Sequence, residues 1–125
     1  MTVTTNWMKK WYNYFNRIYF EGILLPEGEP GEEYTIELVP IKKSVNYLGQ
    51  CRYKNNNHVV LVLNNRYDKM IEIEWQNVLL HEMIHVWQHV MGYKGGHGAS
   101  FIKKAKEINE FGWGITTKYD EFRNI

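Results

Sequence analysis

Large apolar side chains recur every three or four positions near the start of the chain. This spacing predicts a helix over about residues 6–20, with Thr5 or Asn6 as its N-cap. The side chains that follow the helical period are Trp7, Trp11, Tyr14, Phe15, Ile18 and Tyr19. Gly22 and Pro26 then end the element.

Residues 34–63 show the shorter period of β-strands, in which apolar and polar positions alternate. Strands are predicted at 34–39, 45–53 and 58–63. The asparagine-rich stretch 54–57 is expected to form a hairpin turn, because Asn tolerates left-handed backbone angles. Since the connections are short, the strands are expected to pair as a small antiparallel three-stranded meander.

A second helix is predicted after the strands. It begins between Asp68 and Ile73 and runs to about Met91, where Gly92 supplies a natural stop. No Gly or Pro interrupts it, and apolar residues surround it on nearly all sides. This pattern is typical of a buried, central helix.

A third helix is predicted over about residues 99–111. Its buried stripe is expected to consist of Phe101, Ile102, Ala105 and Ile108. Lys103, Lys104 and Lys106 lie outside that stripe and are expected to form a solvated face, with a phosphate contact as the alternative. The elements indicate an α+β fold with an N-terminal helix, a small, mainly antiparallel sheet, a central helix and a C-terminal helix.

Length and composition narrow the classes of protein to consider. The chain has 125 residues, the size of one domain with its own core, so residues 1–125 are interpreted as a single domain. The net charge of +1 provides no strong field for nucleic acid or membranes. One cysteine excludes an intrachain disulfide framework, and no apolar stretch reaches the length of a membrane span. We expect a cytoplasmic protein, or one in the host-cell cytoplasm if it is phage-encoded.

The predicted central helix contains the sequence His81-Glu82-Met83-Ile84-His85. Residues four apart lie on the same face of a helix, so His81 and His85 can direct two imidazoles to one point. Imidazole is a good zinc ligand, and a catalytic zinc site needs three protein ligands and one open position for water. Glu82 lies beside the first histidine and can take a proton from that water.

Three further residues are candidates for the third ligand. His97 is the best placed, because the glycines around it let the chain turn back over the helix. His89 continues the four-residue spacing but lies about 12 Å along the helix axis from His81, so it is expected at the surface or behind the ligands. Cys51 is expected to be a half-buried structural thiol in a strand.

These residues resemble the SprT-like (Spartan-type) zinc metalloprotease domain. The specific part of the resemblance is the His81-Glu82-x-x-His85 motif, followed by the sequence Gly-His-Gly-Ala-Ser-Phe at 96–101. Residues 14–26 are similar to the first-helix signature of that family, and residues 49–53 to its middle strand. The resemblance covers about residues 7–111.

The resemblance implies a minimal zincin-like fold and an endopeptidase that hydrolyses protein substrates. It implies that His81, His85 and His97 bind one Zn²⁺ ion per chain and that Glu82 is the general base. Zincins hold extended substrates against the edge of a sheet, a form of strand addition. Relatives that cleave proteins crosslinked to DNA often carry a cysteine-rich zinc ribbon, which the single cysteine here cannot build.

Two other functions stay open at this point. The chain could be a nucleic-acid or protein binding module without proteolytic activity. In that case zinc would stabilise the fold, while Lys, Arg and aromatic side chains would contact single-stranded DNA. It could also be an interaction protein in which the motif is accidental. For the enzyme hypothesis, the donor that stabilises the oxyanion is open among Tyr47, Tyr93 and Tyr119.

Overall fold

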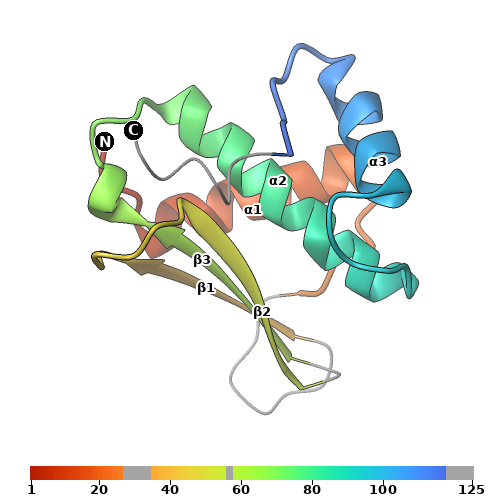
Figure 1. Ribbon diagram of the computed structural model, residues 1–125, viewed down its shortest axis with the longest axis horizontal. Coiled ribbons are helices and arrows are strands. Elements are labelled where there is room, and N and C mark those ends of the chain that lie inside the picture. Colours follow the sequence, from red (N-terminus) through yellow and green to blue (C-terminus); the bar gives the residue numbers. More distant parts are fainter. Residues whose placement is uncertain (27–34, 56–57, 118–125) are drawn as a thin grey trace.

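The computed structural model describes residues 1–26, 35–55 and 58–117. In this part of the chain, three α-helices pack with a three-stranded sheet, and α2 lies centrally between α1, α3 and the sheet (Figure 1). The elements in chain order are α1 (Thr5–Tyr19), β1 (Thr35–Ile41), β2 (Gly49–Asn55), β3 (His58–Asn64), a short 3₁₀ helix (Asn65–Tyr67), α2 (Glu72–Met91) and α3 (Ala99–Asn109). The α+β fold class is confirmed.

The order of the strands corrects the expected meander. The sheet has the order β1-β3-β2, in which β1 pairs with β3 in parallel and β2 pairs with β3 in antiparallel orientation. The sheet is therefore mixed, with β2 at one edge. The expected second strand was also too long, because β2 begins only at Gly49.

Hydrophobicity explains why β3 takes the central position. All seven residues of β3 are buried, so both of its faces need cover and both of its edges need partners. The sequence of β2, Gly-Gln-Cys-Arg-Tyr-Lys-Asn, is more polar and suits an edge. Pro40 in β1 suits the opposite edge, because proline cannot donate a hydrogen bond to a second neighbour. Residues 56–57 of the expected hairpin turn lie outside the described residues.

Helix α1 matches its expected range, but its cap and its buried face differ from the prediction. Its N-cap is Thr4, whose side-chain oxygen accepts a hydrogen bond of 3.1 Å from the backbone N–H of Trp7. The fully buried residues are Met8, Tyr12 and Phe15. Tyr14 and Ile18, expected on the apolar stripe, are instead 41% and 42% exposed. The helix is so rich in aromatic residues that spacing alone did not decide which side faces the core.

Helix α2 is the buried central helix that its sequence predicted. Its backbone begins with a hydrogen bond of 3.1 Å from the N–H of Ile71 to the Glu74 carboxylate, and ends at Gly92, whose φ of 72° lies in the left-handed region. Most of its residues are buried, and four of them are polar: Gln76, His81, Glu82 and Gln88. Buried polar groups need partners, and His81, Glu82 and Gln88 lie close together along the helix, so this part of α2 is a candidate site.

Helix α3 buries Phe101, Ala105 and Ile108, as expected, but Ile102 is 51% exposed and lies outside the stripe. Lys104 also departs from the expected solvated face. Its ammonium lies 5.2 Å from the Phe20 ring and 5.3 Å from the Trp87 ring, and its side chain is only 14% exposed. Two cation–π contacts therefore hold this lysine in the structure.

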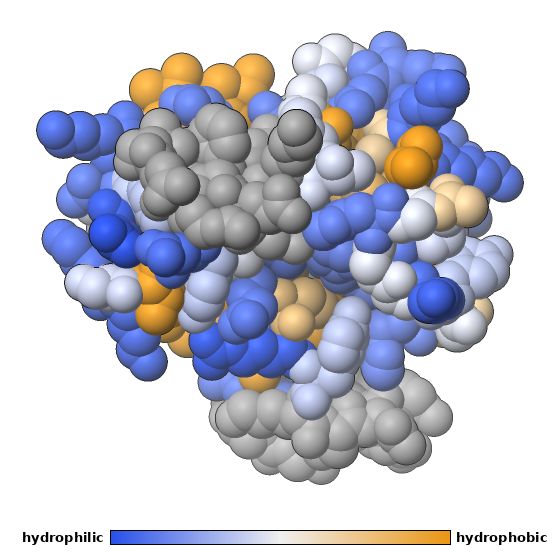
Figure 2. Space-filling view, in the orientation of Figure 1, coloured by the Kyte–Doolittle hydropathy of each residue, from blue (hydrophilic) through white to orange (hydrophobic). Residues whose placement is uncertain are grey.

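The segment after α3 packs back onto the fold. Ile115 is buried, and the indole N–H of Trp113 donates a hydrogen bond of 2.6 Å to the Tyr19 hydroxyl. Hydrophilic residues cover most of the described surface on the face shown in Figure 2, with small hydrophobic patches between them. Within the described ranges, no helix combines the length and the apolar character needed to cross a membrane.

Candidate metal centre

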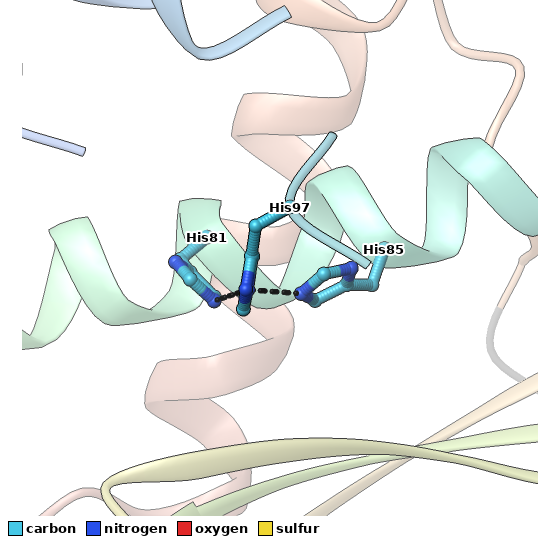
Figure 3. A group of neighbouring side chains, drawn as sticks. All are labelled: His81, His85 and His97. Carbon is cyan, nitrogen blue, oxygen red and sulfur yellow. Dashed lines mark hydrogen bonds between the residues drawn. The ribbon is translucent and has the colours of Figure 1, made fainter. Parts of the chain in front are cut away.

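Three histidines converge on one point beside α2. His81 and His85 project from the same face of the helix, one turn apart, and His97 reaches over them from the loop between α2 and α3 (Figure 3). The Nε2 atom of His97 lies 3.2 Å from Nε2 of His81 and 3.2 Å from Nε2 of His85. One ligand atom from each residue lies within 4.8 Å of the other two, so the group can hold a metal ion.

The protonation of His81 is fixed by a backbone carbonyl. Its Nδ1 lies 2.6 Å from the carbonyl oxygen of Thr116, in the segment that follows α3. A carbonyl can only accept, so Nδ1 carries the ring proton and donates it. The Nε2 atom is therefore left with a lone pair directed at the other two histidines, which is the form in which imidazole binds metals.

The protonation of His85 is fixed by a glutamine. Its Nδ1 lies 2.8 Å from the side-chain oxygen of Gln88, while the Gln88 amide nitrogen donates to the carbonyl of Gly96 at 3.0 Å. Because the Gly96 carbonyl needs a donor, the amide nitrogen must face it and the amide oxygen must face His85. His85 therefore also carries its proton on Nδ1 and presents a lone pair at Nε2.

The donor set fits a zinc ion. Nε2 is unprotonated on both His81 and His85. A single proton on Nε2 of His97 cannot make a full hydrogen bond to both of these atoms at once. A cation at the centre would attract all three lone pairs. Tetrahedral zinc with Zn–N bonds of 2.0–2.1 Å places its nitrogen ligands about 3.3 Å apart, close to the two observed separations of 3.2 Å.

Phe101 packs against all three imidazoles. Its ring centroid lies 4.8 Å from that of His81, 5.2 Å from that of His85 and 4.9 Å from that of His97. Phe101 is completely buried, so it closes one side of the histidine group with an apolar surface. The phenylalanine of the motif at 96–101 thus restricts the orientation of every candidate ligand.

Glu82 is buried at 1% exposure and borders the same site. Its Oε2 atom lies 3.9 Å from Nε2 of His81, close enough to act on a water molecule held by the histidines. The residue also lies against β2, where Gly49 leaves room for it. A Cβ atom added at Gly49 would come within 3.1 Å of the Glu82 side chain.

A cleft of about 430 Å³ opens in front of the histidines. It is bordered by Glu82 and His85 from α2, by Gly95 and Gly96 from the loop, and by the loop before β2. The residues of β2 that line it are Gly49, Gln50, Cys51 and Tyr53. β2 is an edge strand among the described residues, and four of its residues line this cleft beside the candidate catalytic groups.

The side chains of Cys51 and Tyr53 line this cleft, and both keep their protons at neutral pH. Burial, and secondarily the charge of Glu82, raises the pKa of the Cys51 thiol from 9.0 to about 12. Burial also raises the pKa of Tyr53 well above its usual value. The Tyr53 hydroxyl donates a hydrogen bond of 3.1 Å to the backbone carbonyl of His85, which links β2 to the helix turn that carries a candidate ligand.

The remaining sequence candidates fall outside the centre or at its rim. His89 stacks on the Tyr53 ring, with centroids 4.7 Å apart, and is not part of the histidine group. Tyr47 lines the cleft, and its hydroxyl accepts a hydrogen bond of 2.6 Å from Arg52. Tyr93 packs against Trp87 instead. Tyr119 lies outside the described residues.

Three parts of the site were missed from sequence. Gln88 lies three residues after His85, a spacing that brings helix side chains together, so this contact could have been found. Gly49 was placed in a strand but was not connected with Glu82. The Thr116 carbonyl had no signal in the sequence, because any residue type supplies a backbone oxygen.

Comparison with known proteins agrees with this geometry. Residues 8–120 match the model of the SprT-like family. No curated protein matches the chain.

Proposed function

The chain belongs to the SprT-like family, and we propose that it is a zinc-dependent endopeptidase in which His81, His85 and His97 bind the metal and Glu82 is the general base. The convergence of three imidazoles beside a buried glutamate carries this proposal. The tautomers of His81 and His85 support it, because hydrogen bonds to Thr116 and Gln88 leave both Nε2 atoms ready to bind a cation.

A bound zinc ion would polarise the scissile carbonyl and lower the pKa of its water towards 7. Glu82 would take a proton from the attacking water and pass it to the leaving amine, a role that suits its buried position beside His81. Of the tyrosines considered as donors to the oxyanion, Tyr47 is the one that the structure describes in the cleft. We therefore assign to its hydroxyl the hydrogen bond that, besides the metal, stabilises the oxyanion.

The substrate in this proposal is an extended segment of a protein. The outer edge of β2 offers backbone N–H and C=O groups along the cleft, and an added strand would lie beside Gly49 and Cys51 with its backbone near Glu82. Main-chain pairing recognises any extended peptide. Sequence preference would then come from the cleft residues, mostly uncharged apart from Glu82.

The decisive experiment compares the wild-type protein with Glu82→Gln. The substitution keeps the size of the side chain but removes the base, so we expect about one zinc per chain in both proteins. Cleavage of an unfolded protein substrate should fall by about 10²–10⁴-fold or more in the variant. Equal cleavage by the two proteins would exclude Glu82 as the base, and a purified protein without zinc would exclude the metal centre.

A second function is supported by the outer face of α1. A groove of about 530 Å³ there is lined by Lys10, Trp11, Asn13, Tyr14 and Arg17. Lys10 lies 5.0 Å from the Trp11 ring and Arg17 lies 5.6 Å from the Tyr14 ring, so positive charge and aromatic surface alternate. This combination suits the phosphates and bases of single-stranded nucleic acid.

Titration of labelled single-stranded DNA at two salt concentrations tests this second function. We expect weak binding that decreases with salt, because phosphate contacts release counterions. The double variant Lys10→Glu, Arg17→Glu should lose the interaction while it keeps its zinc and its peptidase activity. Binding without any salt dependence, or binding that survives the double substitution, would contradict it.

A further inference from the structure

Gln88 is a buried polar residue that contacts one candidate ligand, His85, and the loop that carries another, His97. It lies on α2, is 1% exposed, and uses both ends of its amide. The amide oxygen accepts from Nδ1 of His85 at 2.8 Å. The amide nitrogen donates to the carbonyl of Gly96 at 3.0 Å and to the hydroxyl oxygen of Ser100 at 3.0 Å.

These contacts join three segments that are separate in the sequence. His85 belongs to α2, Gly96 belongs to the loop directly before His97, and Ser100 lies in the first turn of α3. The backbone N–H of Tyr93 also bonds to the Gln88 carbonyl at 2.9 Å, where the helix ends and the loop begins. Gln88 therefore links the loop that carries His97 to the helix turn that carries His85.

The direction of the hydrogen bonds matters as much as their number. The Gly96 carbonyl can only accept, so it orients the Gln88 amide, and the oriented amide in turn requires the proton of His85 to lie on Nδ1. A loop that moved away from Gln88 would remove this constraint. The amide could then rotate, and His85 could adopt the tautomer that has no lone pair at Nε2.

We propose that Gln88 is a positioning residue that couples closure of the His97 loop to the metal-binding tautomer of His85. This inference rests on the metal centre of the proposed function and extends it. His85 and His97 therefore become able to bind the metal together, because the loop contact that brings His97 into place also holds the proton of His85 on Nδ1.

Three variants separate the two links that Gln88 makes. Gln88→Met has a similar length and removes both links, which leaves His85 Nδ1 and the Gly96 carbonyl without their shared partner. Gln88→Glu keeps an acceptor for His85 but loses the donor to the loop. Gln76→Met is the matched control, since Gln76 is also a buried glutamine of α2, about 18 Å further along the helix axis.

Zinc affinity is measured by competition with a chelator, and the tautomer of His85 by the ¹⁵N chemical shifts of its ring in the metal-free protein. We expect Gln88→Met to bind zinc roughly 10- to 100-fold more weakly than wild type and to lose the single tautomer of His85. Gln88→Glu should keep the tautomer and show an intermediate affinity. Gln76→Met should match wild type in both measurements.

The proposal is overturned if Gln88→Met binds zinc as tightly as Gln76→Met, or if His85 keeps one tautomer in Gln88→Met. Both results are distinct from failure of the metal centre itself, in which wild type and Gln76→Met would also fail to bind zinc. Thermal unfolding of the metal-free variants shows whether Gln88→Met is folded. If it is not, Ser100→Ala and Gln88→Glu test the loop link alone, and wild-type affinity in both would overturn the proposal.

Discussion

The backbone of Gly49 in β2 lies directly against the side chain of Glu82 in α2. A Cβ atom at residue 49 would be 3.1 Å from Cγ of Glu82, and equally close to side-chain atoms of Leu63 and Val78. The absence of a side chain at Gly49 is therefore what lets the edge strand approach the candidate base. The distance between β2 and the candidate base Glu82 depends on this contact.

Gly49→Ala tests that relationship. The added methyl group must displace Glu82 or its neighbours, so we expect a loss of about 1–3 kcal/mol of stability and a fall in peptidase activity of about 100-fold, with zinc retained. Urea unfolding, zinc content and cleavage of an unfolded protein measure the three effects. Gly114→Ala is the control, because its nearest neighbour would lie 3.9 Å away. Unchanged cleavage in Gly49→Ala would show that Glu82 has room to move.

The histidines are tested by single alanine substitutions and elemental analysis. His81→Ala, His85→Ala and His97→Ala should each lose most of the zinc, because each removes one of the three candidate ligands. His89→Ala should keep about one zinc per chain, since His89 stacks on Tyr53 outside the group. If His97→Ala kept its full zinc content, His97 would be excluded as the third ligand.

The half-buried thiol of Cys51 predicts a pH dependence for the metal-free protein. A shift of the Cys51 pKa from 9.0 to about 12 lowers its thiolate fraction about 1,000-fold below pH 9, so alkylation by iodoacetamide should slow by a similar factor relative to the chain in urea. Metal-free protein is needed because a nearby cation would stabilise the thiolate. Alkylation equally fast in folded and unfolded chains would contradict the burial of this thiol.

The same shift has a consequence for stability. Above pH 9.0 the unfolded chain loses the Cys51 proton while the folded protein keeps it until about pH 12. The contribution of this thiol to stability is therefore complete below pH 9.0 and decreases as the pH rises from 9.0 to 12. Tyr53, whose pKa is also raised, adds to the decrease. Urea unfolding from pH 8 to 11 should show a smaller decrease for Cys51→Ala than for wild type.

Asn109 supports His81 through the segment after α3. Its side-chain oxygen accepts from the N–H of Ile115 at 2.8 Å, and its amide nitrogen donates to the carbonyl of the same residue at 3.0 Å. This pairing holds the chain next to Thr116, whose carbonyl orients His81. Asn109→Leu should weaken zinc binding by roughly 10-fold, and Asn109→Asp, which keeps the acceptor, by less. Chelator competition measures both, and wild-type affinity in Asn109→Leu would disprove the link.

The histidine motif was predictable because its geometry is local. Residues four apart on a helix always share a face, so His81 and His85 could be paired before any fold was known. The glycines around His97 indicated a loop able to return over the helix, and the structure places that loop there. The hydrophobic periods also identified three helices and three strands, although Tyr14 and Ile18 were assigned to the wrong side of α1.

The pairing of the strands could not be predicted from local spacing in the sequence. Short connections favoured a meander, but the choice of neighbours depends on which strand buries most surface in the finished sheet. The continuous hydrophobic run of β3 was the available signal, and it outweighed chain order. In this arrangement β2, whose residues line the cleft, is an edge strand among the described residues.

The sequence alone indicated the candidate ligands His81 and His85, the candidate base and the helix that presents them, because helical spacing operates over a few residues. The tertiary structure decided which edge strand faces Glu82, where the cleft lies, and which groups orient the histidines. The partners of His81 and Glu82, Thr116 and Gly49, are more than thirty residues away along the chain. Such contacts arise from packing, which brings distant backbone atoms together regardless of the local pattern.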